Sequence, residues 1–165
     1  MSAYLNGAAQ FFIPTHLLAV VALGLMVGQG ARTAIAMALA LGLAAGSFAV
    51  ASAVREMPAA TALLILAAVV ATLVAVNLKG PWWVGVAMAL ATGLVLPFNA
   101  PPHEITIPAA IAAQIGFAVA ALAAFAFVTV VAMQAVRPWQ RIGIRIVSSW
   151  IAASAILVLA LRLAR

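Results

Sequence analysis

Long uninterrupted apolar runs constrain this chain more than any other feature of its sequence. Each run is near or above the ~20 residues that an α-helix needs to cross the hydrocarbon core of a bilayer. The runs are rich in Ala, Leu and Val and do not alternate, so they predict helices and not the strands of a barrel. We expect an all-α protein, a polytopic membrane helix bundle that forms a single integral-membrane domain over residues 1–165. The six expected helices are 9–29, 32–53, 58–78, 82–99, 106–135 and 142–163.

The scarcity of charge indicates what surrounds these helices. The chain is 68% hydrophobic and 6% charged, whereas a soluble domain carries about 25% charged residues. Lipid must therefore solvate most of the surface. The basic residues all stand at the ends of apolar runs: Arg32, Arg55, Lys79, Arg137, Arg141, Arg145, Arg162 and Arg165. This placement is typical of topology signals and headgroup contacts, so we expect a lipid bilayer as partner and no nucleic acid.

The distribution of Lys and Arg between the loops predicts an orientation. With six helices, one face of the membrane holds Arg55, Arg162 and Arg165. The opposite face holds Arg32, Lys79, Arg137, Arg141 and Arg145. The face with more basic residues is expected in the cytoplasm, which leaves both termini outside. No basic segment precedes the first apolar run, so we expect no cleaved signal peptide.

Proline and small residues suggest how the helices bend and pack. Pro14 either kinks the first helix or marks the true start of the spanning helix, with Tyr4–Phe12 as a separate interfacial piece. Pairs of small residues four apart predict close helix approach in a compact bundle. These pairs are Gly24 with Gly28, Gly42 with Gly46, and Gly116 with Ala120. We expect Trp82, Trp83 and Trp139 at the membrane interface and Trp150 between helices.

His16 is the only histidine inside an apolar run, and burial of a polar group in a membrane is costly enough to suggest function. Its neutral imidazole could ligate a transition metal or relay a proton, or it could simply be satisfied by a backbone carbonyl or by the Thr15 hydroxyl. An even number of crossings separates the start of the first helix from the loop after the fourth. His16, Asn99, His103 and Glu104 are therefore expected in the same half of the bilayer.

Two histidines and a carboxylate would suit nickel, zinc or iron better than copper(I). We therefore expect His16, His103 and Glu104 as candidate metal ligands, with an exposed loop pair as the alternative for His103 and Glu104. No nucleotide-binding, zinc-protease or triad motif is present, and two carboxylates leave little material for acid–base catalysis. We expect no enzyme, no catalytic residues and no bound cofactor beyond a transported ion.

Two segments resemble the HupE/UreJ family. Thr15–Gln29 is similar to the family's first-helix motif, in which an Asp-His pair precedes Leu-Leu-Ala, an apolar stretch, Gly-Leu and a Gln; Thr15 stands in place of the Asp. Arg141–Ala160 resembles the closing helix, with its Arg, Ser-Trp-Ile and Leu-rich run. The resemblance implies a nickel, or more broadly divalent-metal, permease, with His16 as the metal-binding histidine. We expect this protein in the bacterial cytoplasmic membrane, where the loop charges place both termini on the periplasmic side.

The chain lacks most of the histidines of that family, which leaves a second hypothesis open. The fifth helix has no histidine in the Phe117–Phe127 region, and the segment after the fourth helix carries only His103. The scaffold could therefore serve as a non-catalytic accessory or structural subunit of a larger membrane protein complex. Co-purification with a large assembly would favour this second hypothesis, and retained metal would favour the permease.

Overall fold

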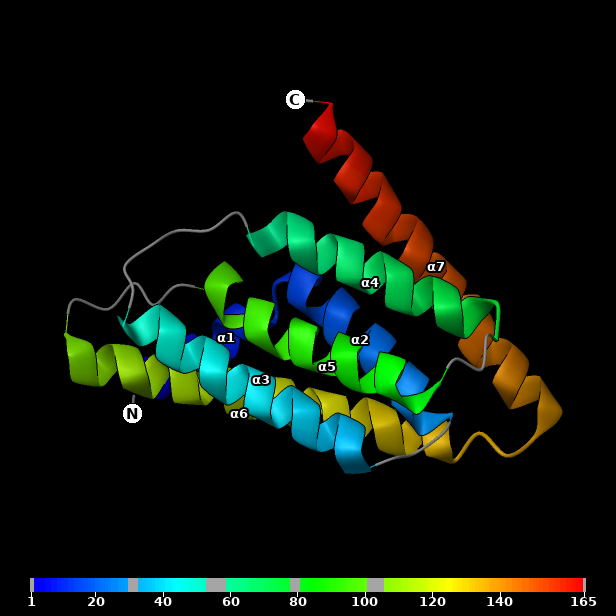
Figure 1. Cartoon of the computed structure of the whole chain (residues 1–165), viewed down its shortest axis with the longest axis horizontal. Helices are drawn as coiled ribbons and strands as arrows, with labels where there is room; N and C mark the ends of the chain where they lie inside the picture. The colour runs from blue at the N-terminus through cyan, green and yellow to red at the C-terminus, as the bar shows by residue number, and fades with distance from the viewer. Residues whose placement is uncertain (1, 30–32, 53–58, 78–80, 101–105, 165) are drawn as a thin grey trace.

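The computed structural model describes residues 2–29, 33–52, 59–77, 81–100 and 106–164, and nearly all of these residues lie in helices (Figure 1). No strand occurs in these ranges. The predicted all-α class is therefore confirmed. The elements are α1 Ser2–Phe11, α2 Pro14–Gly28, α3 Thr33–Ser52, α4 Ala59–Ala75, α5 Trp82–Val95, the short 3₁₀ helix η1 Pro97–Asn99, α6 Ile107–Met133 and α7 Pro138–Leu163.

The expected first helix, 9–29, is in fact two helices. α1 and α2 meet at a bend of 69°. Ile13 is extended, with φ −64° and ψ 133°, and Pro14 occupies the first turn of α2, where its missing N–H costs least. Of the two alternatives for Pro14, the structure shows the second: α2 starts at this proline, and the preceding residues form a helix of their own.

The remaining expected helices correspond to α3, α4, α5 with η1, α6 and α7. The last one begins four residues before the expected 142, because Pro138 opens the helix. The backbone N–H of Arg137 donates to Gln140 Oε1 at 2.9 Å, which satisfies a donor at this helix start.

Four stretches are long and apolar enough to cross a membrane: Thr33–Val50, Trp82–Asn99, Ile107–Met133 and Pro138–Leu163. A fifth is obtained if the bent pair α1–α2 counts as one span. α4 is apolar but has only 17 residues. The described part of the chain therefore has four or five candidate crossings, compared with the six expected from the sequence.

Glycines in close contact with the backbone of a neighbouring helix let the helices approach one another. α3 packs chiefly on α5, α1 on α6, and α2 on both α4 and α6. Gly42 of α3 faces Gly93 of α5, and a Cβ at Gly42 would lie 2.6 Å from the Leu90 carbonyl oxygen. A Cβ at Gly116 of α6 would come closer still to the backbone of Tyr4 in α1. The small residues predicted to permit close packing are thus found at helix crossings.

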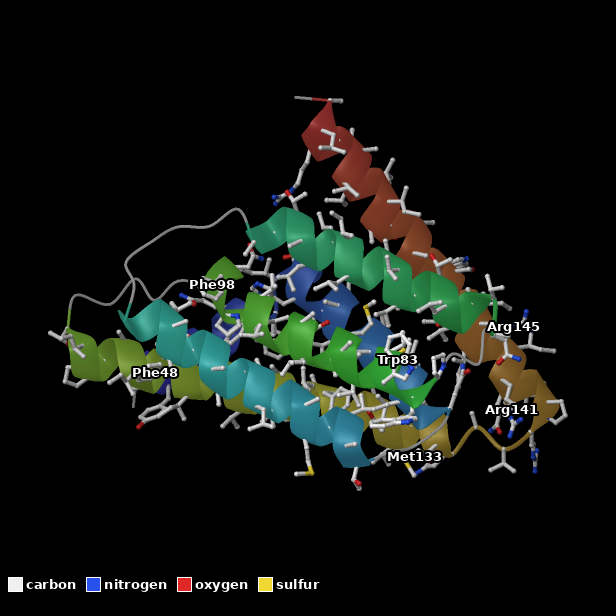
Figure 2. The ribbon with its side chains drawn as sticks, viewed as in Figure 1. Phe48, Trp83, Phe98, Met133, Arg141 and Arg145 are labelled. Carbon is white, nitrogen blue, oxygen red and sulfur yellow. The ribbon has the colours of Figure 1, made fainter. Side chains whose placement is uncertain are left out.

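α7 lies on α4 but runs at a marked angle to the bundle, and its C-terminal part projects beyond the other helices (Figure 1). Its buried residues recur at helical spacing and form one face: Ser148, Ile151, Ala152 and Ala155. Trp150 is 72% exposed, so the expectation that it packs between helices is wrong. Arg141 and Arg145 lie at the same end of the bundle as Trp83 and Met133 (Figure 2). Arg141 and Arg145 therefore share one end of the bundle with Trp83, which the sequence predicts at the membrane interface.

Candidate functional site

His16 occupies the first turn of α2, immediately after the break in the first span. Its side chain is completely buried, and its own N–H donates to the Ile13 carbonyl at 3.0 Å. The bend at Ile13 directs the ring toward the end of α1 and toward η1, which are both within contact distance. The break at Ile13-Pro14 thus positions the imidazole in the interior. A continuous helix would instead extend in the direction of α1.

Both ring nitrogens of His16 are hydrogen bonded. Nδ1 lies 3.0 Å from the carbonyl oxygen of Gln10, at the end of α1. Because a carbonyl only accepts, Nδ1 carries the proton. Nε2 lies 2.9 Å from Asn99 Nδ2, so its lone pair accepts from the amide. The ring is therefore the neutral tautomer with its proton on Nδ1. Its Nε2 electron pair, through which a neutral histidine binds transition metals, accepts the Asn99 hydrogen bond.

Aromatic rings close the site on the side of α6. Phe117 meets the His16 ring edge to face, with centroids 5.3 Å apart and an interplanar angle of 86°. Phe11 packs on Phe117 at 6.1 Å in the same manner. Phe11 and Phe117 are both fully buried. The imidazole therefore lies in a dry, aromatic environment that makes its few polar contacts energetically important.

η1 places Asn99 opposite His16. The 3₁₀ turn Pro97–Asn99 follows α5 directly, and Asn99 Nδ2 also donates to Thr15 Oγ1 at 3.3 Å. The next carbonyl, that of Ala100, accepts a 3.1 Å hydrogen bond from Gln114 Nε2 of α6. Side chains of α2, η1 and α6 are thereby linked into one polar network at this end of the bundle.

Of the three candidate ligands, the structure describes only His16; His103 and Glu104 lie outside the described residues. Within the described ranges, no three His, Cys, Asp or Glu side chains come together. The groups near one another that contain nitrogen or oxygen atoms able to bind a metal are the His16 imidazole, the Asn99 amide and the Thr15 hydroxyl. Such N and O donors suit a borderline divalent ion such as nickel or zinc.

Sequence reasoning placed His16 and Asn99 in the same half of the bilayer, and their direct contact agrees with this. It also named a backbone carbonyl as a possible partner of His16, which Gln10 provides. It missed Phe117 as part of the site. The available signal was the three-residue spacing of Gln114 and Phe117, which puts both on one face of a helix.

No family model, curated protein or solved structure matches this chain. The functional argument therefore rests on the chain's own residues. These define a helical protein with several spans apolar enough for a bilayer and with one buried histidine at a broken helix.

Proposed function

We propose that this protein is a small divalent-metal permease of HupE/UreJ type, with nickel as its expected cargo and His16 as the residue that contacts the ion. The observation that carries the proposal is the buried imidazole at the α1–α2 break, whose Nε2 electron pair faces the Asn99 amide. The ion is the transported substrate, and no catalytic step is required.

The broken first span supports a transport site. Transporters build their midplane sites from discontinuous helices, because the freed carbonyls and helix ends can coordinate ions. Here the C-terminal ends of α1 and of α5–η1 both reach His16, through the Gln10 carbonyl and Asn99. The partial negative charge at helix C-termini favours a cation. It offsets the partial positive charge at the N-terminus of α2.

The chain after Asn99 leads directly to the other two proposed ligands. His103 follows Asn99 by four positions and Glu104 by five. The proposal requires this segment to bring both side chains to the His16 site. Rotation of the Asn99 amide would expose Nε2 and turn the amide oxygen toward an incoming ion.

The resemblance of Thr15–Gln29 to the HupE/UreJ first helix gives independent support. On this basis the protein has six spans, with α1–α2 as one broken crossing and α4 as a short one. It resides in the bacterial cytoplasmic membrane with both termini in the periplasm. The end that carries Arg137, Arg141 and Arg145 then faces the cytoplasm, as the positive-inside rule requires.

Nickel content and nickel uptake test the proposal. Protein purified in mild detergent is expected to retain about one Ni²⁺ per chain by mass spectrometry, and proteoliposomes are expected to take up Ni²⁺. His16→Gln should lose the metal, with a loss of affinity of at least about tenfold. Ser149→Ala, on an exposed hydroxyl of α7, is the matched control and should retain it.

Two loop variants guard against misfolding of the buried variant. His103→Ala and Glu104→Gln change residues of the 101–105 segment and should each weaken nickel binding. Equal absence of nickel in wild type and all variants, together with no uptake, would refute the permease.

A second function is favoured by two other observations. Both nitrogens of His16 already have partners within the chain, as expected of a structural histidine. In addition, α7 presents large apolar side chains outward, among them Trp150, Leu157 and Leu161. An accessory subunit of a larger membrane complex would use such a face against another protein. Metal-free protein that co-purifies in a large, defined assembly would establish this alternative.

A further inference from the structure

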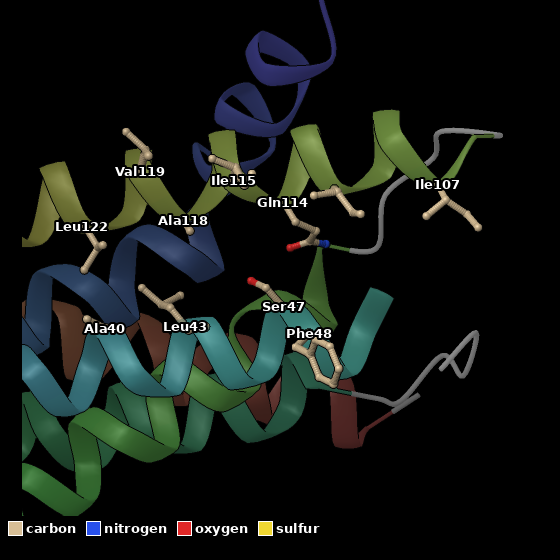
Figure 3. Close-up of a pocket in the computed structure, with 12 residues that line it drawn as sticks. Ala40, Leu43, Ser47, Phe48, Ile107, Gln114, Ile115, Ala118, Val119 and Leu122 are labelled. Carbon is tan, nitrogen blue, oxygen red and sulfur yellow. The ribbon is translucent and has the colours of Figure 1, made fainter. Parts of the chain in front are cut away.

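A second feature of the structure is a groove between α3 and α6. α3 leans on α5, while α6 packs on α1 and α2, so α3 and α6 leave a cavity of about 580 Å³ between them (Figure 3). The lining extends over Ala40–Phe48 of α3 and Ile107–Leu122 of α6. This volume is in the range of pockets that bind small organic molecules.

The groove has an apolar lining, which suits an alkyl chain. Of the twelve lining residues, ten are apolar, and only Ser47 and Gln114 are polar. Phe48 and Ile107 are each 76% exposed, so the groove opens to the lipid side of the bundle. The eight helical steps from Gln114 to Leu122 correspond to about 12 Å. One leaflet of the hydrocarbon core measures about 15 Å.

Gln114 and Ser47 face one another across this groove (Figure 3). Gln114 is only 5% exposed, and its Nε2 donates to the Ala100 carbonyl, which fixes the orientation of the amide. The amide oxygen, Oε1, therefore faces the groove. Neither Gln114 Oε1 nor Ser47 Oγ has a hydrogen-bond partner among the described residues. Buried polar atoms are normally paired, so these two indicate a polar group of a ligand.

The donor and acceptor pattern specifies that group. Gln114 Oε1 only accepts, whereas the Ser47 hydroxyl can donate. A ligand hydroxyl between them would donate to Oε1 and accept from Ser47. The ester carbonyls of ordinary lipids only accept, so they could not satisfy Gln114.

The depth of the pair agrees with a lipid headgroup. Gln114 lies seven residues from the start of α6 and Ser47 five from the end of α3. Both are thus about 8–10 Å from the helix ends on the same side of the bundle. We propose that the α3–α6 groove binds a single-chain lipid with a free hydroxyl headgroup, its hydroxyl held between Ser47 and Gln114 and its chain along α6.

A transmembrane helix fits the groove less well. The backbone groups of a membrane helix are bonded within the helix, so its apolar face would leave Gln114 Oε1 unpaired. The lipid site uses none of the residues assigned to the ion, and it adjoins the His16 site only through the Gln114 hydrogen bond to the Ala100 carbonyl.

Monoolein and methyl oleate are the matched probes, because they share one acyl chain and only monoolein has free hydroxyls. Native mass spectrometry of the full chain in detergent should show one bound monoolein, with methyl oleate about 3- to 10-fold weaker, as expected for one hydrogen bond. Ser47→Ala should weaken monoolein by a similar factor. Ala44→Leu fills the groove and should abolish binding of both.

Ala153→Leu is the control, since Ala153 is exposed on α7, away from the groove. It should bind monoolein as wild type does. Equal binding of the two probes, or full monoolein binding by Ser47→Ala, would overturn the hydroxyl site. The proposal would also be overturned if wild type bound no monoolein and formed a dimer that Ala44→Leu dissociates. That result would assign the groove to a second copy of the chain.

Discussion

Asn99 donates its side-chain amide to Nε2 of His16 over 2.9 Å, which joins two residues 83 positions apart in the chain. The bond connects the end of α5–η1 to the start of α2 inside the bundle. His16 is fully buried and Phe117 covers its ring, so few other donors can replace Asn99. This contact therefore matters for stability whether or not the histidine also meets a metal.

The first prediction concerns this bond. Asn99→Ala leaves a buried nitrogen acceptor unpaired and should lower the free energy of unfolding by about 1–3 kcal/mol. The measurement is the midpoint of thermal unfolding in a fixed detergent. Thr15→Val, which removes only the longer 3.3 Å contact with the same amide, is the control and should cost less. An Asn99→Ala protein as stable as wild type would show that the pair contributes nothing.

The class of the protein could be predicted from the sequence because continuous apolar runs permit few structures in lipid. The bounds of α3 and α6 agree with the expected 32–53 and 106–135 within two residues. The break before Pro14 was left open, because a proline is compatible both with a kink and with a first-turn position. Packing decided it: α1 lies against α6 through Gly7 and Gly116 and so leaves the line of α2.

The candidate site was predicted only in part. Counting crossings put His16 and Asn99 in one half of the membrane, but crossings do not determine helix rotation or tilt. The partner of Nδ1 is a backbone carbonyl, which carries no sequence signal. The pairing of Ser47 with Gln114 across the groove depends on the separation of α3 and α6, which the Ala- and Leu-rich sequence does not specify.

The second prediction tests the close crossing of α3 and α5. Gly42→Ala places a Cβ 2.6 Å from the Leu90 carbonyl oxygen and 3.1 Å from Gly93 Cα. These neighbours are backbone atoms that cannot rotate away. The helices must separate, and we expect a loss of about 1–3 kcal/mol in the free energy of unfolding.

Gly143→Ala is the matched control, since a Cβ there meets nothing within 4 Å. It lies inside α7, where alanine is preferred over glycine by about 1 kcal/mol. The control should be neutral or slightly stabilising in the same thermal assay. Equal destabilisation by both variants would contradict the assigned role of the crossing.

The third prediction concerns a cap supplied by another helix. Arg145 Nε of α7 donates to the Ala75 carbonyl at the C-terminus of α4 over 2.9 Å. A cation at a helix C-terminus contributes about 0.3–1 kcal/mol at an exposed site. Arg145→Gln should therefore lower the unfolding midpoint slightly, and the difference should shrink at high salt. Arg141→Gln, one turn earlier on α7, removes the same charge and should have the smaller effect.

The final prediction concerns orientation, and the absence of cysteine from the sequence makes it simple to test. Trp139 and Leu163 are 64% and 75% exposed and lie at opposite ends of α7, 24 helical steps or about 36 Å apart. Under the positive-inside rule, the end with Arg137, Arg141 and Arg145 is cytoplasmic. A membrane-impermeant maleimide added to spheroplasts should therefore label Leu163→Cys at once and Trp139→Cys only after lysis. The reverse pattern would invert the proposed topology, and it would place the Asn99 end of the His16 site toward the cytoplasm. Labelling of both variants in intact cells would show that α7 does not cross the bilayer.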